Sequence, residues 1–302
     1  MGEQSDEQVP GDLVDADIDE LEDDIDDDLT DDVTDIDDLD EADEDEEADE
    51  ADEDEEPAAA PVRPRLLDRV RWTPVLFLQA AHAKQAIVTA LAMGGVAAVA
   101  GRPAREAGVV LLTVLVGQAI LGWHNDIVDR ERDAAHHTRG KPIGDGRLDP
   151  GSAWYAIVVA GLILVPLSIT TGITAGGIYL VSVCVGMLGN VVLRTGLFSW
   201  VTWAISFAML PAYLSYGGWG GQAVGDPPQT SMTVLAALLG IGVHFMRAVW
   251  GLVADHEDGW TYLPLKLGLK LGATRLLALA TLYTIVIAVL LAVFGARDGL
   301  SQ

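Results

Sequence analysis

Seven long apolar stretches limit this chain more than any other feature of its sequence. They cover residues 81 to 100, 108 to 124, 152 to 170, 173 to 193, 199 to 218, 231 to 254 and 274 to 296. Each has roughly 17 to 24 residues, enough for an α-helix to cross about 30 Å of hydrocarbon. A transmembrane β-barrel would instead show short segments that alternate apolar and polar residues. The sequence therefore predicts an all-α, polytopic transmembrane helix bundle of about seven spans.

The first 62 residues have a very different composition. Of the 46 acidic residues in the chain, 33 lie between Glu3 and Glu56, and no basic residue precedes Arg63. The segment has no aromatic residue, so it is too charged and too poor in large apolar groups to bury a core. It also lacks the positive start and apolar centre of a secretory signal peptide. We predict a disordered acidic tail at 1–62, either without chemistry of its own or binding an unknown partner, followed by a transmembrane domain at 63–302.

The net charge of −28 comes from this tail. Residues 63–302 keep 13 of the 46 acidic residues together with all 18 basic ones, a net of +5. This split excludes a uniformly acidic soluble or halophilic protein, whose acidic residues would be spread over all its loops. The chain has one cysteine, Cys184 in an apolar stretch, which excludes a disulfide framework and a cysteine metal cluster. We expect membrane lipid, and no nucleic acid, among its partners.

The basic residues also predict an orientation. With the N-terminus inside the cell, the segments on the cytoplasmic side carry thirteen Lys and Arg residues, and the opposite side carries Arg102, Arg105 and Arg297. Short basic loops stay in the cytoplasm. We therefore predict a multi-pass protein of the cell membrane with its N-terminus and both long polar loops in the cytoplasm and its C-terminus outside. Lys84 and Arg247 fall inside predicted spans, where ionisable residues are costly and usually functional.

Two polar interruptions, 125 to 150 and 255 to 272, hold nine of the thirteen acidic residues of the membrane domain. The first follows the second span directly, so helical geometry can be continued through it. At 100° per residue, four oxygen-bearing side chains then lie within about 100° of one another, whereas Glu131 points elsewhere. We call these four the first acidic motif: Asn125, Asp126, Asp129 and Asp133. Such a set suits Mg²⁺, which also takes oxygen atoms of a substrate phosphate. The alternative is an acidic loop neutralised by its own Arg130, Arg132 and Arg139.

The second interruption contains Asp255, Glu257 and Asp258. Arg247 lies eight residues before Asp255, about 80° away and on the same face of a continuous helix. A guanidinium there could hold a substrate diphosphate, bound also by the Mg²⁺, with two parallel hydrogen bonds. Alternatively, it could form an ion pair inside the bundle. Lys84 is a weaker candidate for the same role.

These residues resemble the UbiA superfamily of intramembrane prenyltransferases. Its members carry Asn-Asp-x-x-Asp-x-x-x-Asp after the second span, which the first acidic motif matches without a mismatch, and then a segment similar to Lys141 to Leu148. A second motif, Asp-x-x-x-Asp, precedes a segment that Gly259 to Gly268 resembles. This alignment places Asp255 on the second Asp and Gly251 on the first, so one carboxylate is absent unless Asp258 or Glu257 substitutes for it. The family is known for nine spans, and 47 residues follow Asp255, enough for one span.

The resemblance implies an activity and a set of site residues. Two Mg²⁺ ions would bridge the aspartates to a prenyl diphosphate, whose isoprenoid group is transferred to an aromatic or other lipid acceptor, as in isoprenoid quinone biosynthesis. We expect Asp126, Asp129 and Asp255 to be catalytic. Metal ligands are expected at Asn125, Asp126, Asp129, Asp133, Asp255 and Asp258, and substrate contacts at Asn125, Arg139, Lys141, Arg247 and Lys84. The alternatives are a non-catalytic membrane scaffold related to the family and a transporter.

Overall fold

The computed structural model describes residues 72–217 and 225–298, and every regular element in these ranges is a helix. The acidic tail predicted at 1–62 lies outside the described residues. In chain order the helices are α2 (Thr73–Ala80), α3 (Ala83–Val99), α4 (Ala104–Ala135), α5 (Pro150–Ile169), α6 (Ile173–Val191), α7 (Ser199–Ser215), α8 (Thr230–Ala248), η4 (Val249–Gly251), α9 (Leu252–Glu257), α10 (Leu263–Leu271) and α11 (Ala273–Asp298).

The all-α membrane bundle is confirmed, and seven is an approximate number of spans. In the described ranges, five helices are long and apolar enough to cross a membrane: α4, α5, α6, α11 and the continuous unit from α8 to α9. Helices α2 and α3 meet at an angle of 62°, and the number of candidate spans rises to six if the two together form one span. The stretch expected at 199 to 218 is present as α7, but its 17 residues fall short of that test. The protein is an integral membrane protein.

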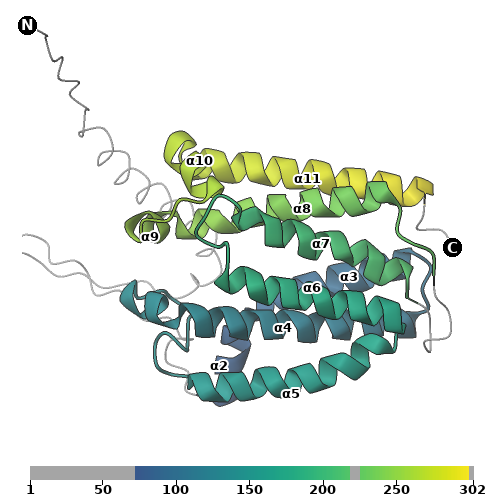
Figure 1. The fold of residues 1–302 in the computed structure, drawn as a ribbon, viewed down its shortest axis with the longest axis horizontal. Coiled ribbons are helices and arrows are strands. Elements are labelled where there is room, and N and C mark those ends of the chain that lie inside the picture. Colours follow the sequence, from purple (N-terminus) through teal and green to yellow (C-terminus); the bar gives the residue numbers. More distant parts are fainter. Residues whose placement is uncertain (1–71, 218–224, 299–302) are drawn as a thin grey trace, which may run out of the picture.

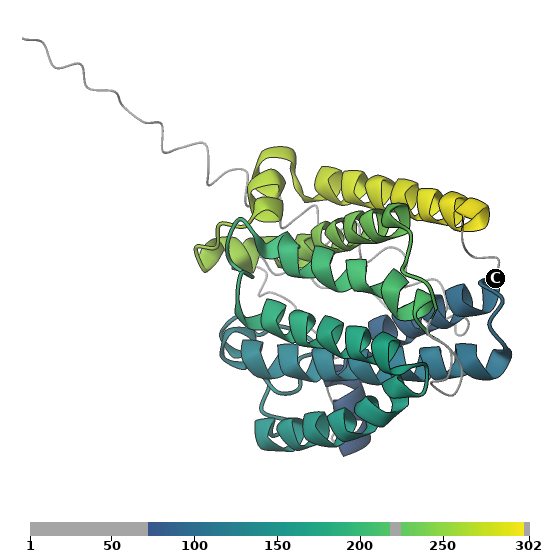
Figure 2. The same cartoon turned by 45° about the vertical axis from the view of Figure 1, so that its right-hand side comes forward.

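The spanning helices lie side by side with their ends at two levels (Figure 1). Neighbours in the sequence are neighbours in space: α3 packs on α4, α4 on α5 and α6, α6 on α7, α7 on α8, and α8 on α11. Figure 2 shows the same succession of helices from another side. Many of the buried positions hold small residues such as Ala80, Ala90 and Ala153, which let helices approach closely.

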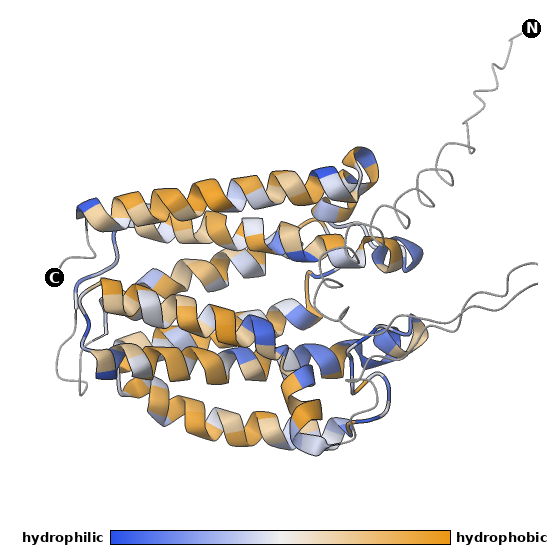
Figure 3. Ribbon diagram, turned by 180° about the vertical axis from the view of Figure 1, so that it is seen from behind, coloured by the Kyte–Doolittle hydropathy of each residue, from blue (hydrophilic) through white to orange (hydrophobic). Residues whose placement is uncertain are grey.

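Hydrophobic residues make up most of the length of the helices, and hydrophilic residues are concentrated toward their ends (Figure 3). Many of the large hydrophobic residues are exposed. On α5, for example, Tyr155 and Leu162 are more than 70% exposed. In water such a surface would promote aggregation, whereas against lipid tails it carries no penalty. Exposed apolar residues along the helices are the opposite of what a soluble protein shows, and they fit the assignment of these helices to a membrane.

Helix α4 positions the candidate site. Its 32 residues extend about 48 Å, which exceeds the hydrocarbon thickness of a bilayer, so the helix continues beyond the apolar layer. The first acidic motif lies on this continuation, as the sequence predicted. Asn190 of α6 supports the same region, because its amide nitrogen donates to the carbonyl of Leu121 (3.3 Å) and lies 3.2 Å from Nδ1 of His124.

The bend between α2 and α3 packs against α4. His82, at the bend, has a positive φ of 50°, which is unusual for a residue with a side chain. Gly122 of α4 allows this close approach, since a Cβ atom at that position would lie 2.6 Å from the carbonyl carbon and oxygen of Ala81. The bend thereby brings His82 Nε2 to 4.0 Å from Asp126 Oδ1.

Candidate active site

The first acidic motif faces the interior of the polar end of the bundle. Asp126 is fully buried and Asp133 is 4% exposed, although both lie near the end of a long helix. The side chain of Glu131 is 85% exposed and pairs with its neighbour Arg130. Asp126 and Asp133 are therefore buried and Glu131 is exposed, as the helical geometry predicted from their positions around α4.

Lys141 joins three members of the motif. Its Nζ lies 3.1 Å from Asp126 Oδ1 and 3.5 Å from Asp133 Oδ2, and it donates to Asn125 Oδ1 at 3.3 Å. The loop that carries Lys141 is held against α4 at Gly144, where a Cβ would approach Asp133 Cβ to 2.8 Å. Lys141, expected to contact substrate, therefore lies among the expected metal ligands.

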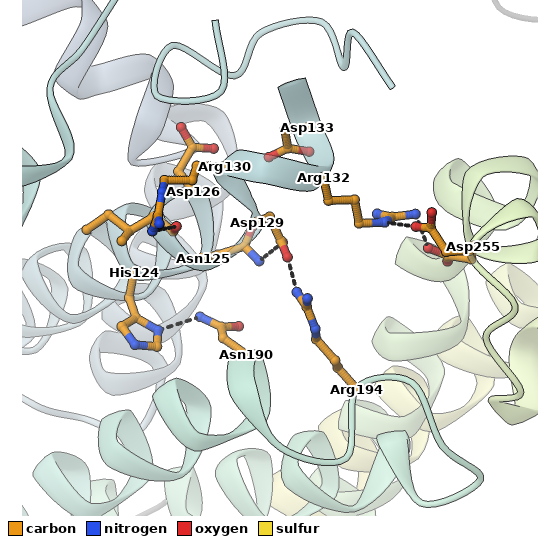
Figure 4. Close-up of polar contacts among 12 residues, drawn as sticks. His124, Asn125, Asp126, Asp129, Arg130, Arg132, Asp133, Asn190, Arg194 and Asp255 are labelled. Carbon is orange, nitrogen blue, oxygen red and sulfur yellow. Dashed lines mark hydrogen bonds and ion pairs between the residues drawn. The ribbon is translucent and has the colours of Figure 1, made fainter. Parts of the chain in front are cut away.

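Asp129 has a different cation. Its Oδ2 accepts a hydrogen bond from the Asn125 amide (2.7 Å), and its Oδ1 is paired with Arg194 from the loop between α6 and α7 (Figure 4). Burial lowers the pKa of the Arg194 guanidinium, while the nearby Asp255 and Asp258 oppose this shift. The group therefore keeps its charge in a partly dehydrated place.

The second acidic segment meets α4 through Arg132. Its Nη2 donates to Asp255 Oδ1 at 2.6 Å, and its Nε donates to Asp258 Oδ2 (Figure 4 shows the pair with Asp255). The hydroxyl of Tyr262 donates to Asp255 Oδ2, and His136 Nε2 lies 2.9 Å from Asp258 Oδ1. The hydrogen bond from Arg132, and then that of His136, lowers the pKa of the Asp258 carboxyl. These contacts join two segments that are more than a hundred residues apart.

Trp260 connects the two halves of the site. The guanidinium of Arg132 lies 4.5 Å from the centre of its ring, and that of Arg194 lies 5.2 Å from it. Both distances are within the range of a cation–π contact. One aromatic ring thus holds the two arginines that pair with Asp255 and Asp129.

Three of the expected substrate-binding residues form no hydrogen bond or ion pair with the carboxylates described above. Arg247 donates to Gln85 of α3 and lies 5.8 Å from the centre of the Trp203 ring. Its alignment with Asp255 assumed an unbroken α-helix, but the 3₁₀ turn η4 lies between them. Arg139 and Lys84 are exposed and form no hydrogen bond or ion pair with any residue of the described ranges.

Arg132, Arg194 and Tyr262 are the site residues that the sequence argument did not assign. Arg132 carried a signal, because it follows Asp129 by three positions and so shares a helix face with it. Arg194 is one of the thirteen basic residues predicted on the cytoplasmic side, and nothing in its local sequence indicates that it pairs with Asp129. For Tyr262 no local pattern distinguishes a hydrogen-bond donor to Asp255 from a tyrosine that anchors the chain at the membrane interface.

The first acidic motif fits Mg²⁺ if a phosphate supplies part of the coordination. Within the described residues, no three His, Cys, Asp or Glu side chains converge to hold a metal ion by themselves. Mg²⁺ commonly needs only one or two carboxylates besides substrate phosphates and water. Both oxygens of Asp126 and Oδ2 of Asp133 are buried without a well-aligned hydrogen bond from the described chain. They therefore retain lone pairs that a hard cation could use.

An apolar groove of about 900 Å³ lies between α4 and α5. Trp123, Tyr155 and Phe77 line it, and Asp149 and Ser152 lie at its polar end. At 100° per residue, Trp123 is about 60° from Asp126 around α4, and Ala119, which also lines the groove, is about 20° from it. The groove therefore lies along the side of α4 that carries Asp126, toward the apolar part of the helix.

Comparison with known proteins identifies the family. A family model described as the UbiA prenyltransferase family matches residues 86–300, which is most of the chain. The chain belongs to the UbiA prenyltransferase family. Among solved structures, that of a UbiA homolog from Archaeoglobus fulgidus bound to GPP and Mg²⁺ is similar, with a TM-score of 0.57 and 14% sequence identity over 74% of this chain and 78% of that one. At this identity the likeness shows a shared fold. No curated protein sequence matches this UbiA family member.

Proposed function

We propose that this protein transfers an isoprenoid group from a prenyl diphosphate to a hydrophobic acceptor, aromatic or another lipid, with the help of Mg²⁺. The observation that carries the proposal is Asp126, a fully buried carboxylate whose two oxygens accept no well-aligned hydrogen bond within the described residues and whose Oδ1 lies 3.1 Å from the Lys141 ammonium. A buried charge with unused acceptor sites is costly unless it serves a ligand. The UbiA family membership and the bound GPP and Mg²⁺ of the archaeal homolog support this interpretation.

The charges of the site suit a diphosphate. Lys141 and Arg194 supply positive charge from two different loops, and both already contact oxygens of the first acidic motif. Asp126, Asp129 and Asp133, with the amide oxygen of Asn125, would hold Mg²⁺. When bound, the ion acts as a Lewis acid that offsets the negative charge developing on the leaving diphosphate. Lys141 and Arg194 would then orient the phosphate oxygens by charged hydrogen bonds.

The transfer needs no oxidant or reductant. The allylic C–O bond of the prenyl diphosphate breaks, and its electron pair leaves with the diphosphate. A bond then forms between the allylic carbon and an electron-rich atom of the acceptor, which loses a proton. The apolar helices around the polar end keep water away from the allylic cation. Asp255 would lie opposite the first acidic motif, where Arg132 and Tyr262 hold it.

The site argues against a transporter. A transport path would place ionisable residues at several depths through the bundle. The carboxylates described above gather instead at the C-terminal end of α4 and around α9, which Arg132 links to α4 (Figure 4). A non-catalytic scaffold would share this geometry, so it must be distinguished by turnover.

The first test separates an enzyme from a scaffold. Asp126→Asn and Asp129→Asn keep the side-chain shape but remove the charge that attracts Mg²⁺, so each should abolish Mg²⁺-dependent release of diphosphate from a panel of prenyl diphosphates. Glu131→Gln is the matched control, because it removes one charge from the same helix at a side chain that is 85% exposed. Equal activity in all three variants, or equal loss in all three, would refute the assignment of the motif.

The acceptor can be found by comparing lipids from cells with and without the protein. Mass spectrometry should show that a prenylated lipid disappears and its unprenylated precursor accumulates. An isoprenoid quinone is the first product class to examine, because aromatic precursors of quinones are electron-rich acceptors.

A further inference from the structure

The segment around Asp255 does not fit a metal ion, in contrast to the first acidic motif. Asp255 Oδ1 accepts from Arg132, and its Oδ2 accepts from Tyr262. Asp258 Oδ2 accepts from Arg132, and His136 contacts its Oδ1 at 2.9 Å. All four oxygens of the two carboxylates thus have partners within the protein. In the first acidic motif Asp129 is held in the same way, by Asn125 and Arg194, but both oxygens of Asp126 and Oδ2 of Asp133 accept no well-aligned hydrogen bond from the described chain and lie near the Lys141 ammonium. This half of the site therefore keeps acceptor lone pairs that the carboxylates of Asp255 and Asp258 have already used.

Gly251 adds to this difference. It is the position at which the family motif has its other aspartate, and it lies at the end of the 3₁₀ turn η4. A Cβ built there would be 3.0 Å from Asp255 Oδ2, so a side chain at this position would lie directly beside the Asp255 carboxylate. The glycine provides no second carboxylate, and Asp255 has a guanidinium as its counter-charge instead.

Arg132 has the position and the free donors to act on an anion. It lies on α4 between Asp129 and Asp133, and its side chain is 22% exposed. Nε and Nη2 are used by the two aspartates, whereas Nη1 donates to no residue of the described ranges. The guanidinium carbon of Arg132 lies over the ring of Trp260, 4.5 Å from its centre, which restrains the group. A planar guanidinium presents its remaining N–H groups in a fixed direction, which suits phosphate oxygens.

We propose that Arg132 replaces the second divalent cation of this site, so that the diphosphate is bound by one Mg²⁺ on the first acidic motif and by the Arg132 guanidinium on the other side. The proposal rests on the proposed function, because it concerns the same diphosphate. In this arrangement Asp255, Asp258 and Trp260 are positioning residues for Arg132, and the expectation that Asp255 and Asp258 bind metal is replaced. Arg132 carries a permanent charge, so this half of the site needs no metal from solution.

The test counts metal ions with Mn²⁺ in place of Mg²⁺ and inorganic pyrophosphate in place of substrate. Purified full-length protein in detergent is titrated with Mn²⁺ with and without pyrophosphate, and electron paramagnetic resonance follows the bound ion. The difference between the two titrations removes Mn²⁺ held loosely by the acidic tail. We expect one magnetically isolated Mn²⁺ per pyrophosphate-bound chain. A coupled pair of Mn²⁺ ions in the unmodified protein would overturn the proposal without affecting the proposed function.

Variants separate binding by Arg132 from support of the fold. Arg132→Gln should weaken pyrophosphate binding by about tenfold or more, the equivalent of at least one charged hydrogen bond, and keep the single Mn²⁺ signal. Arg130→Gln is the matched control, because this exposed neighbour on the same helix pairs with Glu131, and its pyrophosphate affinity should not change. Unchanged affinity in Arg132→Gln, or loss of Mn²⁺ in Asp255→Asn, would also overturn the proposal.

The same measurements show when the proposed function fails. Asp126→Asn should lose the pyrophosphate-dependent Mn²⁺ signal. If neither the unmodified protein nor any variant binds Mn²⁺ in the presence of pyrophosphate, the proposed function and the inference about Arg132 are both refuted.

Discussion

Each principal carboxylate at the polar end of the bundle has a cation of its own. Lys141 lies beside Asp126, Arg194 pairs with Asp129, and Arg132 pairs with Asp255. Carboxylates placed so close would otherwise repel one another and become protonated. Removing one partner of a buried pair is costly because the remaining charge is left without compensation. The cations come from three separate parts of the chain, so the same ion pairs that neutralise the site also hold its loops together.

Tyr262→Phe tests how much one neutral donor contributes to this network. The substitution removes the hydroxyl that donates to Asp255, a residue that is only 5% exposed. We expect the free energy of unfolding to fall by about 1 to 3 kcal/mol, the usual cost of leaving a buried charged acceptor short of a donor. Unfolding in mixed detergent and dodecyl sulfate micelles would measure it.

Tyr283→Phe is the control for this change. Its hydroxyl donates to the carbonyl of Leu238 (3.2 Å), at an exposed position away from any carboxylate. The loss should be smaller than that of Tyr262→Phe. Equal losses in the two variants would contradict a special role for the Tyr262 hydroxyl.

At the scale of elements, α4 is the axis on which the site is built. It contributes the first acidic motif and Arg132, and it packs against α2, α3, α5 and α6. The bend between α2 and α3 fits into a gap that Gly122 leaves on this helix. Helix packing and the placement of His82 beside Asp126 therefore depend on the same close approach.

Gly122→Ala should disturb this packing. The new Cβ would lie 2.6 Å from backbone atoms of Ala81, and backbone cannot yield as a flexible side chain can. We expect a lower unfolding temperature in detergent and weaker Mg²⁺-dependent activity, because the bend would move away from Asp126. Differential scanning fluorimetry and the diphosphate-release assay would measure the two effects.

Gly161→Ala on α5 is the matched control. Nothing in the described chain lies within 4 Å of a Cβ at that position, and alanine favours a helix more than glycine does. Its unfolding temperature should stay the same or rise slightly. If Gly122→Ala behaves in the same way, the bend is not held by this contact.

At the scale of the whole molecule, the two ends of the bundle differ in their basic residues. The end that carries the site includes Arg132, Lys141, Arg194 and Lys266, whereas Arg102 and Arg105 lie at the other end, where α4 begins. Arg102 there donates to the carbonyl of Leu214 at 2.7 Å. Basic loops remain in the cytoplasm, so the end with the site should face the cytoplasm.

Cysteine labelling tests this orientation. Cys184 is first replaced by Ser, and single cysteines are then placed at exposed positions by Lys266→Cys and by Pro227→Cys in the connection between α7 and α8. A membrane-impermeant maleimide applied to intact cells should label position 227, and position 266 should react only after lysis. The reverse pattern would contradict the predicted topology.

The sequence by itself determined the helices and the first acidic motif. Both depend on neighbours within a few residues: apolar runs long enough to span a bilayer, and side chains repeated at helical spacing. The same local rule correctly placed Glu131 away from Asp126, because α4 continues through the motif as one helix. The rule cannot be carried from Arg247 to Asp255, since the 3₁₀ turn η4 interrupts the α-helical periodicity between them.

Only the tertiary structure decided which charges meet. Arg132 and Asp255 are 123 residues apart in the chain, and Arg194 and Asp129 are 65 apart. No periodic pattern within one helix specifies such a pair, because it depends on how α4, α9 and the loop after α6 pack at the same end of the bundle. The sequence could show that Gly251 lacks a carboxylate, but the arginine that neutralises Asp255 in its place appears only when the helices are assembled.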